Sequence, residues 1–267
     1  MKNMKTSKLF VSSTDIKMAP SISDKKYVLN ANDIVIYSIY LPNFSALEED
    51  LYKFLNSLEI KKAKRFYKEI DRNRFIIYRA ILKLVLGAYT QLDVKKIYLD
   101  YDFNRKPYLA SHPWLHFNVS HSENFAVIAI SRKKVGIDIE YLSDDFKFSN
   151  LLPDIFDDNE RLSIQNATDK KTTFYTLWTR KESLVKALGK GIDEDFKYIP
   201  SSDGNHNLDF KLIKNSQNWQ VYSFDLADRY VCAIAFEGLA STPANLELFT
   251  LPDNMNDLLQ MAPIRNH

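Results

Sequence analysis

Apolar residues between positions 173 and 191 recur every three or four positions, which is the period of one stripe along an amphipathic helix. The stripe consists of Phe174, Leu177, Trp178, Leu184, Val185 and Leu188. Gly189 follows it directly, and glycine most readily takes the left-handed conformation found at helix C-termini. The pattern therefore predicts a helix over about 170–188 that ends at Gly189.

A period of two governs the segment Val135-Gly-Ile-Asp-Ile-Glu140, in which apolar and acidic residues alternate. Alternation places successive side chains on opposite faces of a strand. We therefore predict a strand over 134–141, with Ile137 and Ile139 on one face and Asp138 and Glu140 on the other.

The same two periods assign elements to most of the remaining chain. Strands are predicted at 33–41, 96–101, 108–109, 116–119, 125–131, 196–199, 208–212, 219–224 and 230–236. Helical patterns cover 157–167 and 45–89, the latter with a break near 70–73. The longest apolar run, 125–130, is too short for a membrane span, which needs about 20 apolar residues.

The order strand, helices, then several strands occurs twice along the chain. It predicts an α+β fold of two similar lobes that meet at a shared cleft. We expect a flexible N-terminal extension at 1–26, an N-terminal lobe at 27–133, a C-terminal lobe with a metal site at 134–241, and a loose C-terminal tail at 242–267.

Acidic residues of the predicted strand and helix are candidate metal ligands. Asp138 and Glu140 share one strand face, and carboxylates so close disfavour joint ionisation unless a cation lies between them; a solvated outer face is the alternative. On the helix, Trp178, Glu182 and Lys186 are four residues apart and share a side. Glu182 and Lys186 could form an ordinary helix ion pair, with Trp178 packing beside them. If Glu182 instead faces the strand carboxylates, the three oxygen donors suit Mg²⁺ shared with substrate phosphates, and Lys186 becomes a phosphate-facing cation.

Other polar groups have two interpretations each. One helix face carries Lys61, Arg65, Lys68 and Arg72, which form either a solvated face or a basic wall beside an anionic ligand. Ser120-His121-Ser122 lies at a turn, where a surface histidine is the simple account; a hydrolase nucleophile elbow would need the small residues of GxSxG. The chain also lacks GxGxxG and Walker motifs. His112 and His116 flank Pro113 and are assigned structural roles.

Several separated segments resemble, in order, the motifs of 4′-phosphopantetheinyl transferases of the Sfp type. They are FNVSHS at 117–122, GIDIE at 136–140, and WTRKES at 178–183 with KALGKG at 186–191. The resemblance runs from about Asp33 to about Glu237. It implies lobes related by a pseudo-two-fold axis with the active site between them. It also implies Mg²⁺-dependent transfer of the 4′-phosphopantetheine arm of coenzyme A to a serine of an apo acyl or peptidyl carrier protein, with release of adenosine 3′,5′-bisphosphate.

The resemblance further implies roles for individual residues. Asp138, Glu140 and Glu182 would hold the metal. Glu182 is the candidate base, directly or through a water, while Lys186 would stabilise phosphate oxygens and Asp138 would complete the catalytic group. The implied coenzyme A ligands are Lys62, Arg65, Arg74, Lys106, Ser120, His121 and Lys186.

Some positions depart from the family pattern or have a simpler account. Arg105 replaces the glycine that precedes Lys106 in the family's GKP turn, where the lysine meets the nucleotide 3′-phosphate; Arg105 could add a phosphate contact. Glu59 lies near a basic position of some relatives. Glu160 resembles a family acidic position, but an acidic residue at a helix N-terminus explains it more simply. Lys181 is expected to point away from the site.

Composition restricts the function classes. Thirty-six basic and 34 acidic residues nearly balance, so no overall field favours nucleic acid. Leu9-Phe10-Val11 is too short for a signal-peptide core, and the only cysteine, Cys232, reads as a buried thiol that suits a reducing cytoplasm. We expect a cytoplasmic monomer without membrane contacts, serving fatty-acid, polyketide, nonribosomal-peptide or lysine biosynthesis. A Mg²⁺-dependent nuclease, a nucleic-acid-binding module and a non-catalytic carrier-protein binder are the alternatives.

Overall fold

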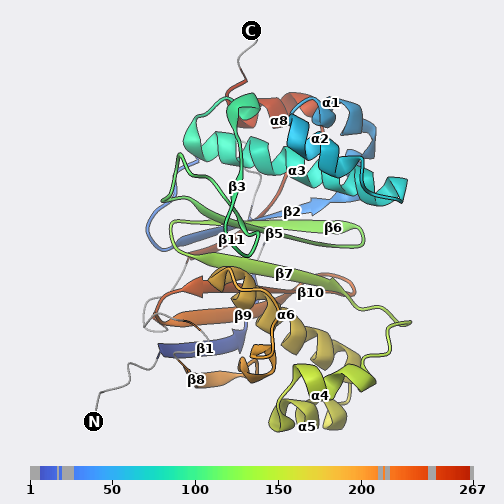
Figure 1. Ribbon diagram of the computed structural model, residues 1–267, viewed down its shortest axis with the longest axis vertical. Helices are drawn as coiled ribbons and strands as arrows, with labels where there is room; N and C mark the ends of the chain where they lie inside the picture. The colour runs from blue at the N-terminus through green and yellow to red at the C-terminus, as the bar shows by residue number, and fades with distance from the viewer. Residues whose placement is uncertain are drawn as a thin grey trace.

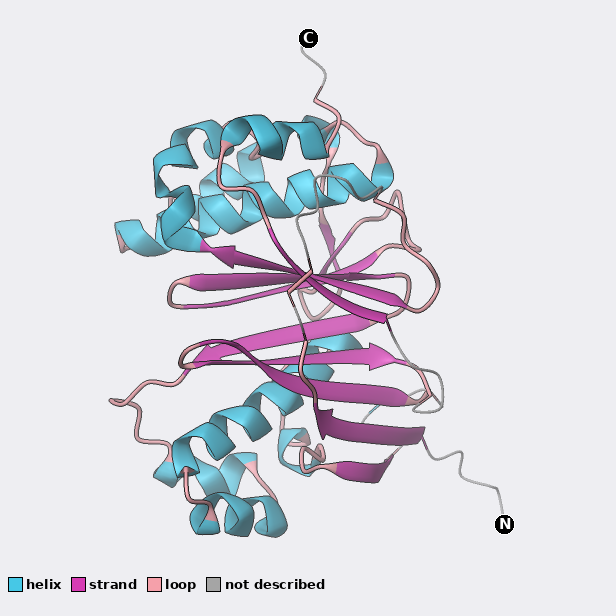
Figure 2. Ribbon diagram, turned by 180° about the vertical axis from the view of Figure 1, so that it is seen from behind, coloured by secondary structure: helices cyan, strands magenta, loops and turns pink. Residues whose placement is uncertain are grey.

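The computed structural model describes residues 7–16, 18–19, 27–209, 213, 217–239 and 245–264. Figure 1 shows four layers in the order helices, sheet, sheet, helices. The two sheets face each other across an apolar layer that includes Ile36 and Ala129 from one sheet and Ile139 and Ile234 from the other. Figure 2 shows the same layers from behind, with helices only on the outer faces of the sheets. The predicted α+β fold with two similar lobes is confirmed.

The first lobe is a four-stranded sheet in the order β11, β2, β6, β5. These strands are β11 (Asn245–Thr250), β2 (Asp33–Tyr40), β6 (Phe125–Ser131) and β5 (His116–Ser122). Its outer face is covered by α3 (Glu69–Thr90), with η2 (Leu41–Leu47), α1 (Glu48–Tyr52), α2 (Ser57–Ala63) and α8 (Met255–Met261) around it. Because α3 lies between the sheet and these helices, it is buried from Phe75 to Ala88. The short η3 (Val94–Lys96) and the hairpin of β3 (Asp100–Tyr101) and β4 (Pro107–Tyr108) follow α3.

The second lobe is a five-stranded sheet in the order β7, β10, β9, β1, β8. These strands are β7 (Val135–Tyr141), β10 (Tyr230–Glu237), β9 (Trp219–Ala227), β1 (Ser7–Ser13) and β8 (Gly204–Leu208). Its helices are η4 (Ser149–Leu151), α4 (Leu152–Ile155), α5 (Asp158–Asn166), α6 (Lys170–Leu188) and η5 (Phe196–Tyr198). Leu184 and Val185 of α6 pack on Val221 and Ala235 of the sheet. The predicted helix at 170–188 and the predicted strand near 134–141 are confirmed.

Segments from the two ends of the chain cross to the opposite lobe. β1 pairs in parallel with β9 and antiparallel with β8, inside the second lobe's sheet. Conversely, β11 pairs in parallel with β2 of the first lobe. The two lobes are therefore interlocked rather than consecutive in the sequence.

The expected flexible extension at 1–26 and loose tail at 242–267 are wrong for the described residues of these ranges. Leu9 and Val11 are fully buried because β1 fills the space between β9 and β8. Phe249 and Leu258 are buried in the helical core of the first lobe. Both segments are short, and neither could bury its apolar side chains without a partner that lies far away in the sequence.

Several local predictions also differ from the structure. The strand expected at 96–101 is formed only at Asp100–Tyr101, after the 3-10 helix η3. The helical stretch at 45–89 breaks twice, at 53–56 between α1 and α2 and at 64–68 between α2 and α3, and it is continuous at 70–73. The predicted strand at 196–199 is the 3-10 helix η5. The strand expected at 208–212 is β8 at Gly204–Leu208, and residues 210–212 lie outside the described part of the chain. Across the described ranges, no helix is both long and apolar enough to cross a bilayer.

Candidate active site

The site lies where edge strands of the two sheets run side by side. Alternate side chains of β5 reach across to β7: Asn118 Oδ1 accepts from the Ile137 amide at 2.8 Å, and Ser122 Oγ accepts from the Tyr141 amide at 3.1 Å. These bonds match residues of β5 and β7 in parallel order. Ser120, between the two contacts, therefore lies opposite Asp138 and donates to its Oδ1 at 2.9 Å.

Gly136 allows α6 to approach β7 unusually closely. A Cβ atom at this position would lie 2.1 Å from the Ser183 carbonyl oxygen and 2.2 Å from the Ala187 amide nitrogen. Only a residue without a side chain permits this contact between helix backbone and strand backbone. The contact places Glu182 and Lys186 of α6 beside the carboxylates of β7.

Asp138 and Lys186 form the centre of the site. Lys186 Nζ lies 2.5 Å from Asp138 Oδ1 and 3.0 Å from Ser120 Oγ. Asp138 is only 3% exposed, and its second oxygen, Oδ2, has no hydrogen-bond partner among the described residues. Burial lowers the pKa of Lys186, but the attraction of Asp138, Glu182 and Glu140 outweighs burial and raises it. The lysine therefore remains charged among carboxylates.

The surroundings of the other two carboxyl groups, Glu140 and Glu182, disfavour their ionised form. Burial and the neighbouring Asp138 raise the pKa of Glu140 to about 7, against weaker opposing effects of hydrogen bonds from Ser122 and Trp178. Burial also raises the pKa of Glu182, with Asp138 adding to the shift and Lys186 opposing it. Three carboxyl groups thus share a site where a single ammonium does not compensate all of them, a condition that a further cation would relieve.

The donor chemistry of this site fits Mg²⁺, although the ligands are not gathered around one point. Within the described residues, no three His, Cys, Asp or Glu side chains are already arranged as a metal-binding group. Lys186 instead takes the position next to Asp138 Oδ1. The buried, unpartnered Oδ2 of Asp138 and the raised pKa values of Glu140 and Glu182 are nevertheless what a hard divalent cation would satisfy.

His121 lies close to several other predicted coenzyme A ligands. Its ring stacks on Tyr78, with centroids 4.9 Å apart. Burial lowers its pKa, and the positive charges of Lys186, Arg74 and Lys62 lower it further, while Asp71 opposes them. The structure therefore brings the basic side chains of Lys186, Arg74 and Lys62 close to His121, with Ser120 bonded to Lys186.

The basic residues in and between α2 and α3 differ in their contacts. Arg74 is held by Asp71 and by Glu123 at 3.1 Å. The ammonium of Lys62 lies over the Phe75 ring at 5.1 Å. Arg65 is exposed, and no ion pair or hydrogen bond of its side chain occurs among the described residues. Its predicted role as a coenzyme A ligand therefore has no support from contacts with the other ligands.

Glu59 and Glu160, the two acidic residues compared with family positions above, have structural roles. Glu59 caps α2 and lies in a buried ionic cluster with Arg79 at 3.8 Å and Lys83 at 3.5 Å. Glu160 caps α5 and pairs with the buried Lys181 at 2.7 Å. Lys181 accordingly points away from the site, as expected.

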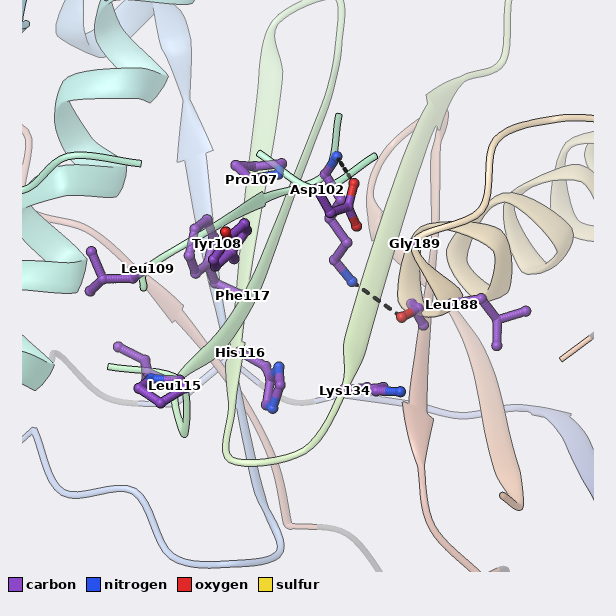
Figure 3. A pocket seen from close by; sticks show the side chains of 13 residues that line it. Asp102, Pro107, Tyr108, Leu109, Leu115, His116, Phe117, Lys134, Leu188 and Gly189 are labelled. Atoms are coloured by element: carbon purple, nitrogen blue, oxygen red, sulfur yellow. Dashed lines mark hydrogen bonds between the residues drawn. The ribbon is translucent and has the colours of Figure 1, made fainter. Parts of the chain in front are cut away.

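Lys106 is placed differently from the expectation of a phosphate ligand. Its ammonium donates to three backbone carbonyls, those of Val135, Lys186 and Ala187. Burial lowers its pKa to about 8. The adjacent cavity has a volume of about 360 Å³ and is lined by His116, Lys134 and Gly189 among others. Figure 3 shows these residues.

Arg105 occupies a backbone conformation that favours glycine. Its φ is 65°, and a left-handed conformation costs a residue with a side chain roughly 1–2 kcal/mol. We expect Arg105→Gly to raise the free energy of unfolding by about 0.5–1 kcal/mol, because relief of strain exceeds the added flexibility of the unfolded chain. Urea unfolding measures this change. A loss of stability would mean that Arg105 makes contacts worth more than its strain.

A groove beside Glu140, lined by aromatic and by polar side chains, was not predicted from the sequence. It has a volume of about 510 Å³ and includes Phe146, Leu151, Tyr175 and Trp178 in its wall. Trp178 therefore faces the groove in addition to packing on Phe174. Phe146 precedes the short 3-10 helix η4 and Leu151 ends it, and a segment this short has no helix or strand period from which the position of its side chains could be predicted.

Comparison with known proteins covers both lobes. The model of the 4′-phosphopantetheinyl transferase superfamily matches residues 134–235, and a model of a 4′-phosphopantetheinyl transferase N-terminal domain matches residues 44–133. The chain is 31% identical to the 4′-phosphopantetheinyl transferase Sfp of Bacillus subtilis over 65% of this chain and 80% of the relative. It is 28% identical to the 4′-phosphopantetheinyl transferase HetI of a Nostoc species, over 80% of this chain and 92% of the relative. A further Bacillus subtilis 4′-phosphopantetheinyl transferase is 30% identical over 74% of this chain and 90% of its own length.

Proposed function

The chain belongs to the 4′-phosphopantetheinyl transferase superfamily and is an enzyme of that class, and from this we propose its reaction in detail. The enzyme transfers the 4′-phosphopantetheine arm of coenzyme A to a serine hydroxyl of an apo carrier protein, with Mg²⁺, and releases adenosine 3′,5′-bisphosphate. The observation that carries the proposal is the cluster of Asp138, Glu140, Glu182 and Lys186 at the junction of β5, β7 and α6.

Asp138, Glu140 and Glu182 would hold the magnesium ion. When bound, Mg²⁺ neutralises pyrophosphate oxygens and withdraws charge from the phosphorus that the serine attacks. Lys186 contributes a fixed positive charge next to Asp138. Because it is anchored by carboxylates before substrate arrives, little reorganisation is needed during transfer.

Coenzyme A would lie along the basic side chains next to His121. Lys62, Arg74, Lys186 and the imidazole of His121 supply hydrogen-bond donors for its phosphates. Stacking on Tyr78 keeps the ring of His121 in a fixed orientation. Ser120 holds Lys186 at 3.0 Å and so sets the direction of its ammonium group.

Glu182 is the proposed acceptor of the serine proton. A carboxyl group with a raised pKa is a better base than an ordinary surface glutamate. The groove beside Glu140 would receive the pantetheine arm, since its aromatic side chains can pack on the methylene groups of the arm and its polar side chains can bond to the amides. The carrier protein would then approach over this groove, and we propose that the enzyme acts as a monomer in the cytoplasm.

Intact mass of a purified apo carrier protein tests the reaction. After incubation with the enzyme, coenzyme A and Mg²⁺, the carrier should gain the mass of one phosphopantetheine arm, and EDTA should abolish the gain. No gain with acyl and peptidyl carriers alike, together with no binding of coenzyme A, would refute the proposed reaction.

Metal-free enzyme should lose stability as the pH rises, because of Glu140. Its pKa is raised from 4.5 to about 7 on folding. Between these values the folded state binds a proton that the unfolded state releases, so the stabilisation present below about 4.5 is lost as the pH rises through about 7. Glu140→Gln removes this contribution. We expect the free energy of unfolding in EDTA, measured with urea at several pH values, to fall more steeply for the wild type than for the variant.

Magnesium provides the companion measurement. At pH 8, Mg²⁺ should raise the melting temperature of the wild type more than that of Glu140→Gln, because binding to the folded state stabilises it. Parallel pH curves for the two proteins, or equal responses to Mg²⁺, would contradict the assignment of Glu140 to the metal site.

A further inference from the structure

The end of α6 is held by a side chain from the other lobe. Lys106, next to β4 of the first lobe, donates from Nζ to the carbonyls of Lys186 at 2.6 Å, Val135 at 3.0 Å and Ala187 at 3.2 Å. Carbonyls in the last turn of a helix lack partners within the helix. Lys106 therefore caps α6 and ties it to the first residue of β7.

The hairpin that carries Lys106 is itself rigidly built. Asp102 Oδ1 accepts from the amides of Asn104 at 2.9 Å and Lys106 at 2.8 Å. Asn104 Nδ2 donates to the Gly189 carbonyl at 2.6 Å, which adds a second tie to the end of α6. Figure 3 shows Asp102 beside Gly189, consistent with the 3.0 Å that would separate Asp102 Oδ2 from a Cβ at Gly189.

The ammonium of Lys106 has no donor left for a substrate phosphate. An ammonium group offers three N–H donors, and three carbonyls accept from it. It can nevertheless influence the reaction through the helix. The residue whose carbonyl it holds, Lys186, places its own ammonium 2.5 Å from Asp138, and Glu182 lies one turn earlier.

We propose that Lys106 is a positioning residue of the transfer reaction, which fixes Lys186 and Glu182 against β7 by clasping the last turn of α6. This inference rests on the proposed function. It assigns Lys106 an effect on the rate of transfer rather than on the binding of coenzyme A.

Lys106→Met tests the inference, because methionine is similar in length but donates no hydrogen bond. Steady-state transfer to an apo carrier would be measured with coenzyme A and with 3′-dephospho-coenzyme A. We expect kcat to fall by about 10–100-fold with either donor, since small displacements of catalytic groups have effects of this size. KM for coenzyme A should change by less than about twofold, as expected when ground-state binding is unaffected.

Direct contact with the 3′-phosphate predicts a different result. A loss confined to coenzyme A, with the dephospho donor unaffected, or a raised KM with unchanged kcat, would overturn the inference. Lys96→Met, on an exposed lysine of the same lobe, is the matched control and should behave as the wild type.

Hydrogen exchange gives a readout that does not depend on activity. The amides of Gly189 and Lys190 bond to the Lys186 and Val185 carbonyls at the end of α6. Lys106→Met should accelerate exchange in the peptide covering 184–191, and Lys96→Met should not. Unchanged exchange in Lys106→Met would overturn the inference. If Lys106→Met exchanges faster but the wild-type enzyme itself transfers nothing to any carrier, the proposed reaction is refuted and the contact between Lys106 and α6 is not.

Asn104→Ala keeps the inference testable if Lys106→Met fails to fold. Asn104 is exposed, and its side chain donates to Gly189. The variant should lower kcat severalfold at unchanged KM and loosen the same peptide. Wild-type kcat together with wild-type exchange would overturn the inference.

Discussion

Asp138→Asn is expected to reduce phosphopantetheine transfer by roughly 10²–10³-fold or more, the usual effect of removing one preorganised group that stabilises charge in the transition state. Asparagine retains the shape of the side chain and can still accept from Ser120 and Lys186, which lie 2.9 Å and 2.5 Å from Asp138 Oδ1. It removes the negative charge that would hold Mg²⁺ and that fixes the ammonium of Lys186. The fold should therefore persist while transfer is lost.

The initial rate of carrier mass gain measures the effect of this substitution. Asp228→Asn, on an exposed aspartate of the same lobe, controls for the loss of one negative charge. Circular dichroism should show the same secondary structure in both variants. Transfer by Asp138→Asn within about tenfold of the wild type would show that Asp138 does not hold the catalytic cation, since loss of such a group costs more.

Gly136→Ala should destabilise the enzyme by about 3 kcal/mol or more, at the upper end of what overpacking costs. The new Cβ would lie 2.1 Å from the Ser183 carbonyl oxygen and 2.2 Å from the Ala187 amide nitrogen. Both are backbone atoms of α6, so no rotation of a side chain relieves the contact. The helix must move away from β7, and it carries Glu182 and Lys186 with it.

Stability and activity should fall together in this variant. Urea unfolding gives the loss of stability, and the mass assay under conditions where the variant is folded should show transfer lowered by at least about 10²-fold. Gly191→Ala is the matched control, because a Cβ there meets no described atom within 4 Å. Near-wild-type stability of Gly136→Ala would mean that α6 and β7 are less closely packed than described.

Much of the site follows from local patterns. The apolar stripe of α6 and the alternation in β7 predicted both elements, and they occur at Lys170–Leu188 and Val135–Tyr141. Family motifs then indicated that Asp138, Glu182 and Lys186 would share one site, and the structure brings them together. These predictions succeeded because the period of a helix or strand is visible in the order of neighbouring residues.

Contacts between distant segments could not be predicted in this way. Leu9 of β1 lies opposite Trp219 of β9, and neither short strand contains any sign of its partner. The same holds for Lys106: its sequence context resembles a phosphate-binding turn, yet its ammonium is bonded to carbonyls of β7 and α6. Which acceptors a lysine meets depends on the packing of lobes, not on neighbouring residues.

The sequence by itself determined the family, the α+β class, the strand and helix that carry the proposed site, and the residue types that can hold a cation and phosphates. The tertiary structure decided that the ends of the chain cross between the lobes, that β5 and β7 meet in parallel through Asn118 and Ser122, and that Lys106 clasps α6. The division has one physical reason. Periodicity and motifs record the environment along an element, whereas burial and hydrogen bonding between elements arise only when segments far apart in the chain pack against one another.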